Sequence, residues 1–212
     1  MKLPDAVSFE EGTLIEPVGC CIRAIEKCKI QSGDTVVIIG AGATGLIHAS
    51  LAKIYGAAKT ITSDLFDYRL NAAKKFGADL TVNPKEENLA EATKAETSGR
   101  GADLVIVTAP SLEAYRTGLS ICRRGGKLCV FAPTRPSEYL QVSPKELFLS
   151  EVQIISSYST SHLETRAALD LLASGKLDGE KLITHRFRLE DAAKAFETAL
   201  ESKESLKVML LS

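Results

Sequence analysis

The chain has 212 residues, with 26 Lys and Arg against 27 Asp and Glu, which gives a formal net charge of -1 at pH 7. This balance excludes a broadly basic nucleic-acid clamp and a polybasic membrane anchor, so we expect neither nucleic acid nor a membrane as a partner. With 45% hydrophobic and 25% charged residues, the composition is that of an ordinary globular protein of one to two domains.

The five cysteines are odd in number and form no C-x-x-C pair. Reduced thiols in a reducing compartment are the simplest interpretation. The N-terminal residues contain no apolar signal core, and the longest aliphatic run, residues 36–39, is far shorter than the roughly 18 residues that a membrane span needs. We therefore expect a cytoplasmic protein.

The chain begins with a helical pattern, in which Val18, Ile22 and Ile25 are spaced as one face of a helix. Short aliphatic runs then alternate with amphipathic stretches, which is typical of βαβ units. The predicted strands are residues 35–39, 60–63, 80–83, 104–108, 127–131 and 153–157. The predicted helices between them are residues 46–55, 68–76, 88–96 and 112–122, stopped by Gly77, Gly99 and Gly125 where the chain turns back. These elements predict an α/β fold with a doubly wound, parallel, six-stranded Rossmann sheet.

After the sixth strand the pattern gives an αβα return segment: a helix over 164–173, an extended piece over 182–187, a helix over 189–200 and a final run over 206–211. Because the sheet is already complete, we expect this segment to pack against something other than the sheet's own core. The predicted division is a lead-in helix and linker (1–30), a Rossmann domain (31–160) and a C-terminal segment (161–212).

The strongest chemical signal is a G-x-G-x-x-G motif at Gly40, Gly42 and Gly45, which ends a predicted strand and opens a helix. The first glycine makes the tight turn, the second lets the backbone approach a pyrophosphate, and the third lets helix and strand pack closely. Asp64 ends the next predicted strand, 19 residues after Gly45. Its carboxylate can accept the hydroxyls of an adenine ribose and would repel a 2′-phosphate, so the pattern predicts a dinucleotide site that prefers NAD to NADP.

Other candidates follow from the rule that ligands of a parallel sheet lie beyond the carboxyl ends of its strands. Arg69 either contacts the adenosine end of the cofactor or is a solvated helix residue. The ends of the later strands, at residues 108–110, 131–133 and 157–159, either line the nicotinamide half of the site or are ordinary turns. His48, His162 and His185 stand apart from other possible metal ligands, so we interpret them as structural or solvent-facing.

Glu16 lies in an apolar segment at the start of the first helix, where the helix dipole alone would favour a carboxylate. The residues so far, together with Ser63-Asp64-Leu65, Phe76-Gly77-Ala78-Asp79, Gly125-Gly126-Lys127 and the stretch 183–187, resemble the medium-chain, zinc-dependent alcohol and polyol dehydrogenases, nearest the sorbitol and threonine dehydrogenase branch. The resemblance implies that Glu16 faces a catalytic zinc, as a ligand or through water and substrate. From motif and resemblance together, the expected cofactor-binding residues are Gly40, Gly42, Ala43, Thr44, Gly45, Asp64, Arg69, Thr108, Phe131, Ala132, Pro133, Ser157, Tyr158 and Ser159.

The resemblance also implies what this chain lacks. Members of the family carry an N-terminal GroES-like catalytic domain that supplies the remaining zinc ligands, and we expect it to be missing here, so that Glu16 alone cannot hold zinc. Ser159 and Thr160 replace an Arg-Tyr pair of the sorbitol enzymes, so the substrate is expected only to be an alcohol or polyol.

Two further expectations concern assembly. Without the catalytic domain, the stretch 183–212 should expose apolar surface. By resemblance the sixth strand, residues 152–158, pairs with its copy in a second subunit, so a homodimer or homotetramer is expected. The expected function is the NAD-binding part of a zinc-dependent dehydrogenase, without activity of its own. The alternative is a stand-alone NAD-binding or interaction module without catalysis.

Overall fold

The computed structural model describes residues 2–201 and 204–212, so residue 1 and residues 202–203, which fall in the first and third predicted segments, lie outside it. Six parallel strands form one sheet in the order β3-β2-β1-β4-β5-β6. The strands are β1 (Thr35–Ile39), β2 (Lys59–Ser63), β3 (Leu80–Val82), β4 (Ala102–Val107), β5 (Cys122–Val130) and β6 (Gln153–Ser156). This is the strand order of a doubly wound Rossmann sheet, so the predicted fold class is confirmed.

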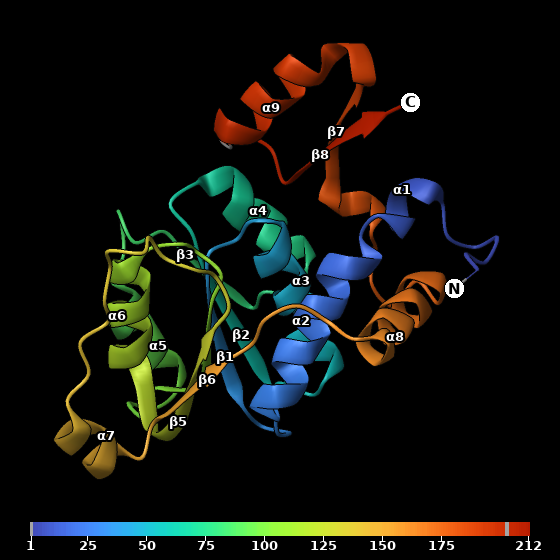
Figure 1. Cartoon of the computed structure of the whole chain (residues 1–212). Helices are drawn as coiled ribbons and strands as arrows, with labels where there is room; N and C mark the ends of the chain where they lie inside the picture. The colour runs from blue at the N-terminus through green and yellow to red at the C-terminus, as the bar shows by residue number, and fades with distance from the viewer. Residues whose placement is uncertain (1, 202–203) are drawn as a thin grey trace.

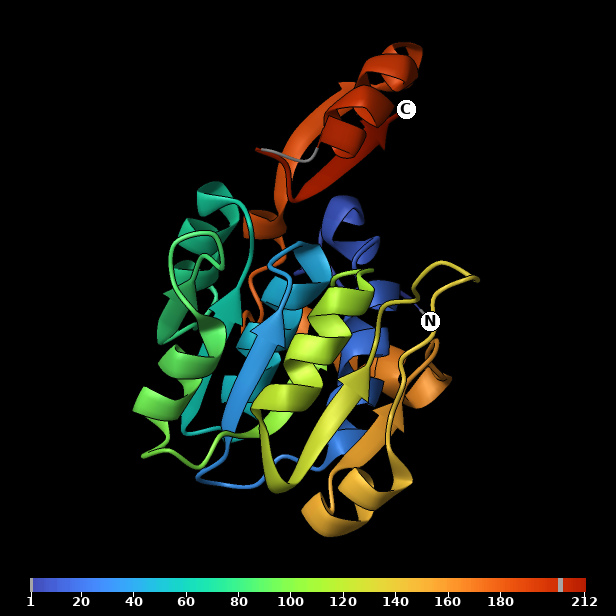
Figure 2. The ribbon, with the colours of Figure 1, turned by 90° about the vertical axis from the view of Figure 1, so that its left-hand side faces the viewer.

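Helices cover both faces of the sheet. One face carries α2 (Ile15–Cys28), α3 (Ala43–Ile54), α4 (Asp67–Lys75) and α8 (His162–Ala173), and the other carries α5 (Leu89–Glu96) and α6 (Leu112–Ile121). Figure 2 shows α5 and α6 in front of the strands, with α2 and α8 behind them. A short helix α1 (Phe9–Gly12) precedes α2, and α7 (Pro144–Ser150) lies between β5 and β6. No helix in the described part of the chain is both long enough and apolar enough to cross a membrane.

Burial on both faces explains the unbroken aliphatic run of β1. Val36 and Ile38 belong to the core under α2 and α3, whereas Val37 and Ile39 belong to the core under α5 and α6. Side chains alternate across a strand, so a strand covered on both faces needs an apolar residue at every position. All five residues of β1 are accordingly buried.

Three details differ from the predictions. The helix α7 was not predicted. Gly125 does not stop a helix, because α6 already ends at Ile121 and Gly125 lies inside β5 with φ 67°. The helix α8 was expected to pack away from the sheet's core, but its Ala168, Leu169 and Leu172 are buried in the same apolar cluster as α2 and α3.

The last part of the chain forms a small separate unit, which stands apart from the sheet in both views (Figure 1, Figure 2). Its strands β7 (Ile183–Arg188) and β8 (Lys207–Leu211) are parallel, and α9 (Ala192–Glu201) lies between them in sequence; two 3-10 helices, Glu180–Leu182 and Leu189–Asp191, flank β7. The Arg186 Nε lies 2.6 Å from Glu10 Oε2 and ties the unit to α1. Leu189 and Phe196 are 63% and 66% exposed, so the unit leaves apolar surface uncovered.

Candidate functional site

The register of the sheet aligns the ends of five strands. Ile39 pairs with Ser63 and with Val107, Val107 pairs with Val130, and Val130 pairs with Ser156. The next residue along each strand is, in sheet order, Asp64, Gly40, Thr108, Phe131 and Ser157. These five predicted site residues therefore lie in one row at the carboxyl edge of the sheet, where ligands of open parallel sheets bind.

The glycine loop has the geometry that its sequence predicts. Gly40 has φ 106°, and a Cβ there would lie 2.6 Å from Thr108 Oγ1. A Cβ on Gly45 would lie 1.9 Å from the carbonyl oxygen of Gly40, so only glycine lets α3 start this close to β1. At Gly42, by contrast, a Cβ would meet nothing within 4 Å. The backbone at Gly42 is thus open to an approaching ligand.

The start of α3 is suited to an anion. The N-cap of α3 is Gly42, which has no side chain that could accept a hydrogen bond. The backbone N–H groups of the first turn, which includes Ala43 and Thr44, therefore receive no capping hydrogen bond from the N-cap residue. Such a helix end combines free N–H donors with a partial positive charge, which suits a phosphate. Thr108, which follows the neighbouring strand β4, holds the loop in place, because its hydroxyl donates to the Gly40 carbonyl oxygen at 2.9 Å.

Asp64 is tied to the same loop. The backbone N–H of Ala41 donates to its Oδ2 at 2.7 Å and that of Phe66 donates to its Oδ1 at 3.0 Å. The Arg69 Nη1 lies 3.7 Å from Asp64 Oδ2, and the Arg69 guanidinium carbon lies 5.4 Å from the centre of the Phe66 ring. The buried Arg69 Nε has no hydrogen-bond partner among the described residues. Asp64, Arg69, Phe66 and Gly40 line a cavity of about 400 Å³ at this end of the row.

A second cavity, of about 470 Å³, lies at the other end of the row. It brings Glu16 of α2 together with Phe131, Pro133 and Ser157, although Glu16 is more than 100 positions from the other three in sequence. Its remaining lining residues are Cys20, Val130, Ala132, Ser156, Tyr158 and Ser159. The Ser157 hydroxyl is buried and has no partner among the described residues. Of the residues predicted for the nicotinamide half, 131–133 and 157–159 line this cavity, whereas 108–110 do not, and Ala109 lines the first cavity.

The thiol of Cys20 is a close polar neighbour of Glu16, because its Sγ donates to Glu16 Oε1 at 3.1 Å. Burial, with the hydrogen bond and negative charge of Glu16 adding to it, raises the pKa of Cys20 to about 12. The thiol therefore stays protonated at neutral pH and acts as a donor. A catalytic zinc needs about three protein ligands, and no cluster of three or more His, Cys, Asp or Glu that could hold a metal occurs among residues 2–201 and 204–212. These residues alone do not fit a zinc ion.

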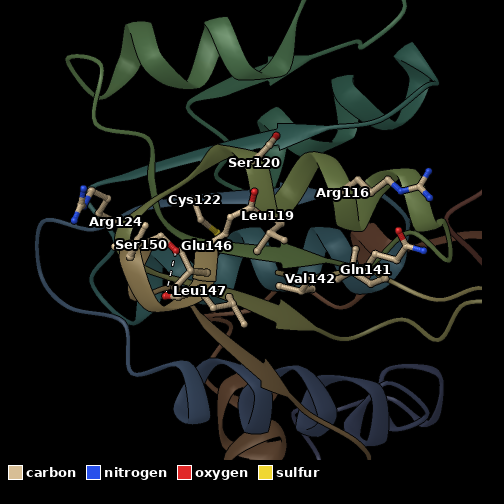
Figure 3. Close-up of a pocket in the computed structure, with 13 residues that line it drawn as sticks. Arg116, Leu119, Ser120, Cys122, Arg124, Gln141, Val142, Glu146, Leu147 and Ser150 are labelled. Carbon is tan, nitrogen blue, oxygen red and sulfur yellow. Dashed lines mark hydrogen bonds between the residues drawn. The ribbon is translucent and has the colours of Figure 1, made fainter. Parts of the chain in front are cut away.

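A third cavity, of about 540 Å³ and so larger than these two, lies elsewhere. It is formed by α6, the first residues of β5, the loop before α7 and α7 itself, and so adjoins the amino end of β5 (Figure 3). Figure 3 shows the Arg116 and Arg124 side chains pointing away from its middle in opposite directions. Ligands of parallel sheets bind at the carboxyl ends of the strands, so the position of this cavity at the amino end of β5 argues against a cofactor site despite its size.

The three histidines fall in different surroundings. His162 is exposed at the start of α8, and His185 in β7 stacks on Phe187 with the ring centres 6.3 Å apart. His48 in α3 is fully buried. Its Nδ1 lies 2.8 Å from the Thr44 carbonyl oxygen, its Nε2 has no partner among the described residues, and burial lowers its pKa to about 4.

Comparison with known proteins identifies the family. The sequence model of a family described as zinc-binding dehydrogenase matches residues 43–174, from the glycine loop to the end of α8. The chain belongs to this family. The resemblance seen in the sequence is thereby confirmed.

Individual relatives support the same family assignment. The chain is 36% identical over 209 residues to a sorbitol dehydrogenase of Bacillus subtilis, which covers 98% of the chain but only 59% of the relative. Two solved structures superpose closely. An alcohol dehydrogenase of Escherichia coli CFT073 in complex with NADH has a TM-score of 0.90 at 28% identity, over 100% of the chain and 62% of that protein. A zinc-binding dehydrogenase of Sinorhizobium meliloti 1021 bound to NADP has a TM-score of 0.87 at 26% identity, over 92% and 57%.

Cys20 and Phe66 are among the residues of these cavities that sequence reasoning missed. Cys20 is four positions after Glu16, so a helix places both on one face, and this spacing could have revealed it. Phe66 follows Asp64 by two positions, but its place beneath Arg69 depends on how α4 starts. No sequence signal available in one chain shows that.

Burial of His48 makes stability pH-dependent. The imidazole of His48 binds a proton below a pH of about 6.5 in the unfolded chain but only near pH 4 in the folded one. The contribution of neutral His48 to the free energy of unfolding is therefore fully present above pH 6.5 and is lost as the pH falls toward 4. Between pH 7.5 and 5.5 we expect His48 to account for a loss of about 1 kcal/mol in the free energy of unfolding. Urea unfolding at both pH values should show a smaller loss for His48→Phe, while the exposed control His162→Gln should behave as the wild type. Equal losses in all three proteins would contradict the assignment.

Proposed function

We propose that this chain is the NAD-binding part of a zinc-dependent dehydrogenase that transfers a hydride between a secondary alcohol or polyol and NAD. The row of strand ends that joins the glycine loop, Asp64 and Phe131 is the observation that carries the proposal. Bound NAD supplies the chemistry by accepting or returning the hydride at its nicotinamide ring. This chain's residues bind and orient it: the residues of the first cavity take the adenosine, the start of α3 the pyrophosphate and the second cavity the nicotinamide.

NAD is proposed rather than NADP because of Asp64. Two of the roughly four acceptor positions of its carboxylate are used by Ala41 and Phe66, so two remain for the ribose hydroxyls. A 2′-phosphate would meet this negative charge in a side chain that is only 7% exposed. Since one relative was solved with NADH and another with NADP, the choice in this chain rests on Asp64 and not on the family.

Glu16 is the proposed catalytic and metal-facing residue. It lines the same cavity as Phe131, which puts its carboxylate beside the place proposed for the nicotinamide. Since the described residues do not complete a zinc site, the other ligands must come from protein outside this chain. The chain spans about 59% of the length of its Bacillus subtilis relative, so that relative contains further sequence of the kind that could carry such ligands.

We further propose a division into residues 1–30, 31–160 and 161–212, in which α2 of the first segment and α8 of the third pack on the core of the second. The unit formed by β7, α9 and β8 would then pack, through Leu189 and Phe196, against the part that carries the zinc ligands. The outer edge of β6 is unpaired among the described residues and includes Ile154, 41% exposed, so we propose that it pairs with a second copy in a homodimer or homotetramer. The five free cysteines support a reducing, cytoplasmic setting.

The lack of a three-ligand metal cluster among the described residues favours a second candidate function, a stand-alone NAD-binding or interaction module without catalysis. Both functions use the same cofactor residues, so cofactor binding cannot separate them. Turnover and zinc content can.

Asp64 should control both affinity and cofactor choice. We expect Asp64→Ala to weaken NAD binding roughly 10- to 100-fold, because hydrogen bonds to a charged group are lost. Asp64→Asn, which keeps the shape but not the charge, should narrow the preference for NAD over NADP. Calorimetric titration of both cofactors measures this, with the exposed Asp170→Asn as control. Unchanged affinities in both variants would remove Asp64 from the site.

The zinc-facing role of Glu16 predicts what the 212 residues cannot do alone. The purified chain should bind NAD yet hold no stoichiometric zinc and form no NADH from alcohols or polyols, because Glu16 and Cys20 supply at most two ligands. Metal analysis and absorbance at the NADH band measure this. Stoichiometric zinc together with alcohol-dependent NADH formation would overturn the view that the chain is an incomplete catalyst.

A further inference from the structure

His48 is a buried imidazole that the proposed function does not use. It lies in α3, three residues after Gly45, and is 0% exposed. The Thr44 carbonyl oxygen, 2.8 Å from its Nδ1, can only accept, so Nδ1 carries the proton and donates. The other ring nitrogen, Nε2, is then an acceptor, and it is buried without a partner among the described residues.

An unsatisfied buried acceptor is unfavourable, and an apolar side chain of similar size would avoid it. Packing alone therefore gives no reason for a histidine here. The contacts of the ring suggest one. Its centre lies 4.5 Å from that of the Phe131 ring, with the two planes at 81°, an edge-to-face arrangement that aromatic pairs prefer.

Phe131 connects His48 to the site. It follows β5 directly in the row of strand ends and lines the cavity that also contains Glu16. His48 thus holds two things at once: its Nδ1 is tied to the first turn of α3, and its ring contacts a side chain in the wall of the cavity. Both contacts are specific in direction, and an aliphatic side chain would make neither.

We propose that His48 is a positioning residue for the nicotinamide end of the cofactor, fixing the Phe131 ring relative to the pyrophosphate-binding turn of α3. This inference rests on the proposed function. It makes a distinction that the proposed function alone does not: loss of the His48 ring should weaken binding of the nicotinamide half and leave the adenosine half intact.

The test is calorimetric titration of the 212-residue chain with NAD and with ADP-ribose, which lacks the nicotinamide. His48→Leu should weaken NAD binding about three- to tenfold and change ADP-ribose binding by less than about twofold. His48→Phe, which keeps a ring against Phe131 but loses the hydrogen bond to Thr44, should weaken NAD binding less than His48→Leu does. If His48→Leu does not fold, His48→Met removes the ring in the same way.

A double-mutant cycle with Phe131→Leu adds a readout that a general packing defect would not give. Because the two rings act through one contact, the combined variant should lose less NAD affinity than the product of the single losses. Equal weakening of NAD and ADP-ribose, multiplicative losses in the cycle, or a His48→Phe defect as large as that of His48→Leu would each overturn the inference. A wild-type chain that binds neither ligand would instead overturn the proposed function, and this inference with it.

Discussion

The hydrogen-bonded register of the parallel sheet is the constraint on which the rest of the structure depends. Because β1 pairs Ile39 with both Ser63 and Val107, the chain leaves three neighbouring strands at the same level, at Gly40, Asp64 and Thr108. A slip of one residue would turn each buried strand over and exchange the side chains of its two cores. With both faces covered by helices, no such slip is tolerated, and the site residues stay aligned.

The glycine loop converts this alignment into a binding surface. The carbonyl oxygen of Gly40 leaves no room for a side chain at Gly45, because α3 starts directly against β1. The Thr108 hydroxyl and the Asp64 carboxylate then hold the loop from two adjacent strands, through the Gly40 carbonyl and the Ala41 N–H. The same groups that shape the loop thus face the proposed cofactor, so a change at Asp64 affects both the loop and the ligand.

The strands of the sheet and the position of Asp64 could be predicted from local sequence. The strands followed from aliphatic runs, and Asp64 from its spacing to Gly45, because both depend on residues close together in the chain. The helix α7 also has a local sequence signal, Ser143 followed by Pro144 and Glu146, and in the structure the Ser143 hydroxyl accepts from the Glu146 N–H. Glu16 is different, since nothing near it in sequence shows that α2 brings it to the cavity of Phe131; only the resemblance suggested a role. The contact between His48 and Phe131 joins residues 83 positions apart and could not be predicted at all.

A crystal structure of the chain with NAD would test most directly whether the cofactor lies along the row of strand ends. We expect the adenosine ribose against Asp64, the pyrophosphate at the start of α3 and the nicotinamide in the cavity between Glu16 and Phe131. A nicotinamide at the Asp64 end, or a dinucleotide bound instead in the larger cavity between α6 and α7, would contradict this expectation.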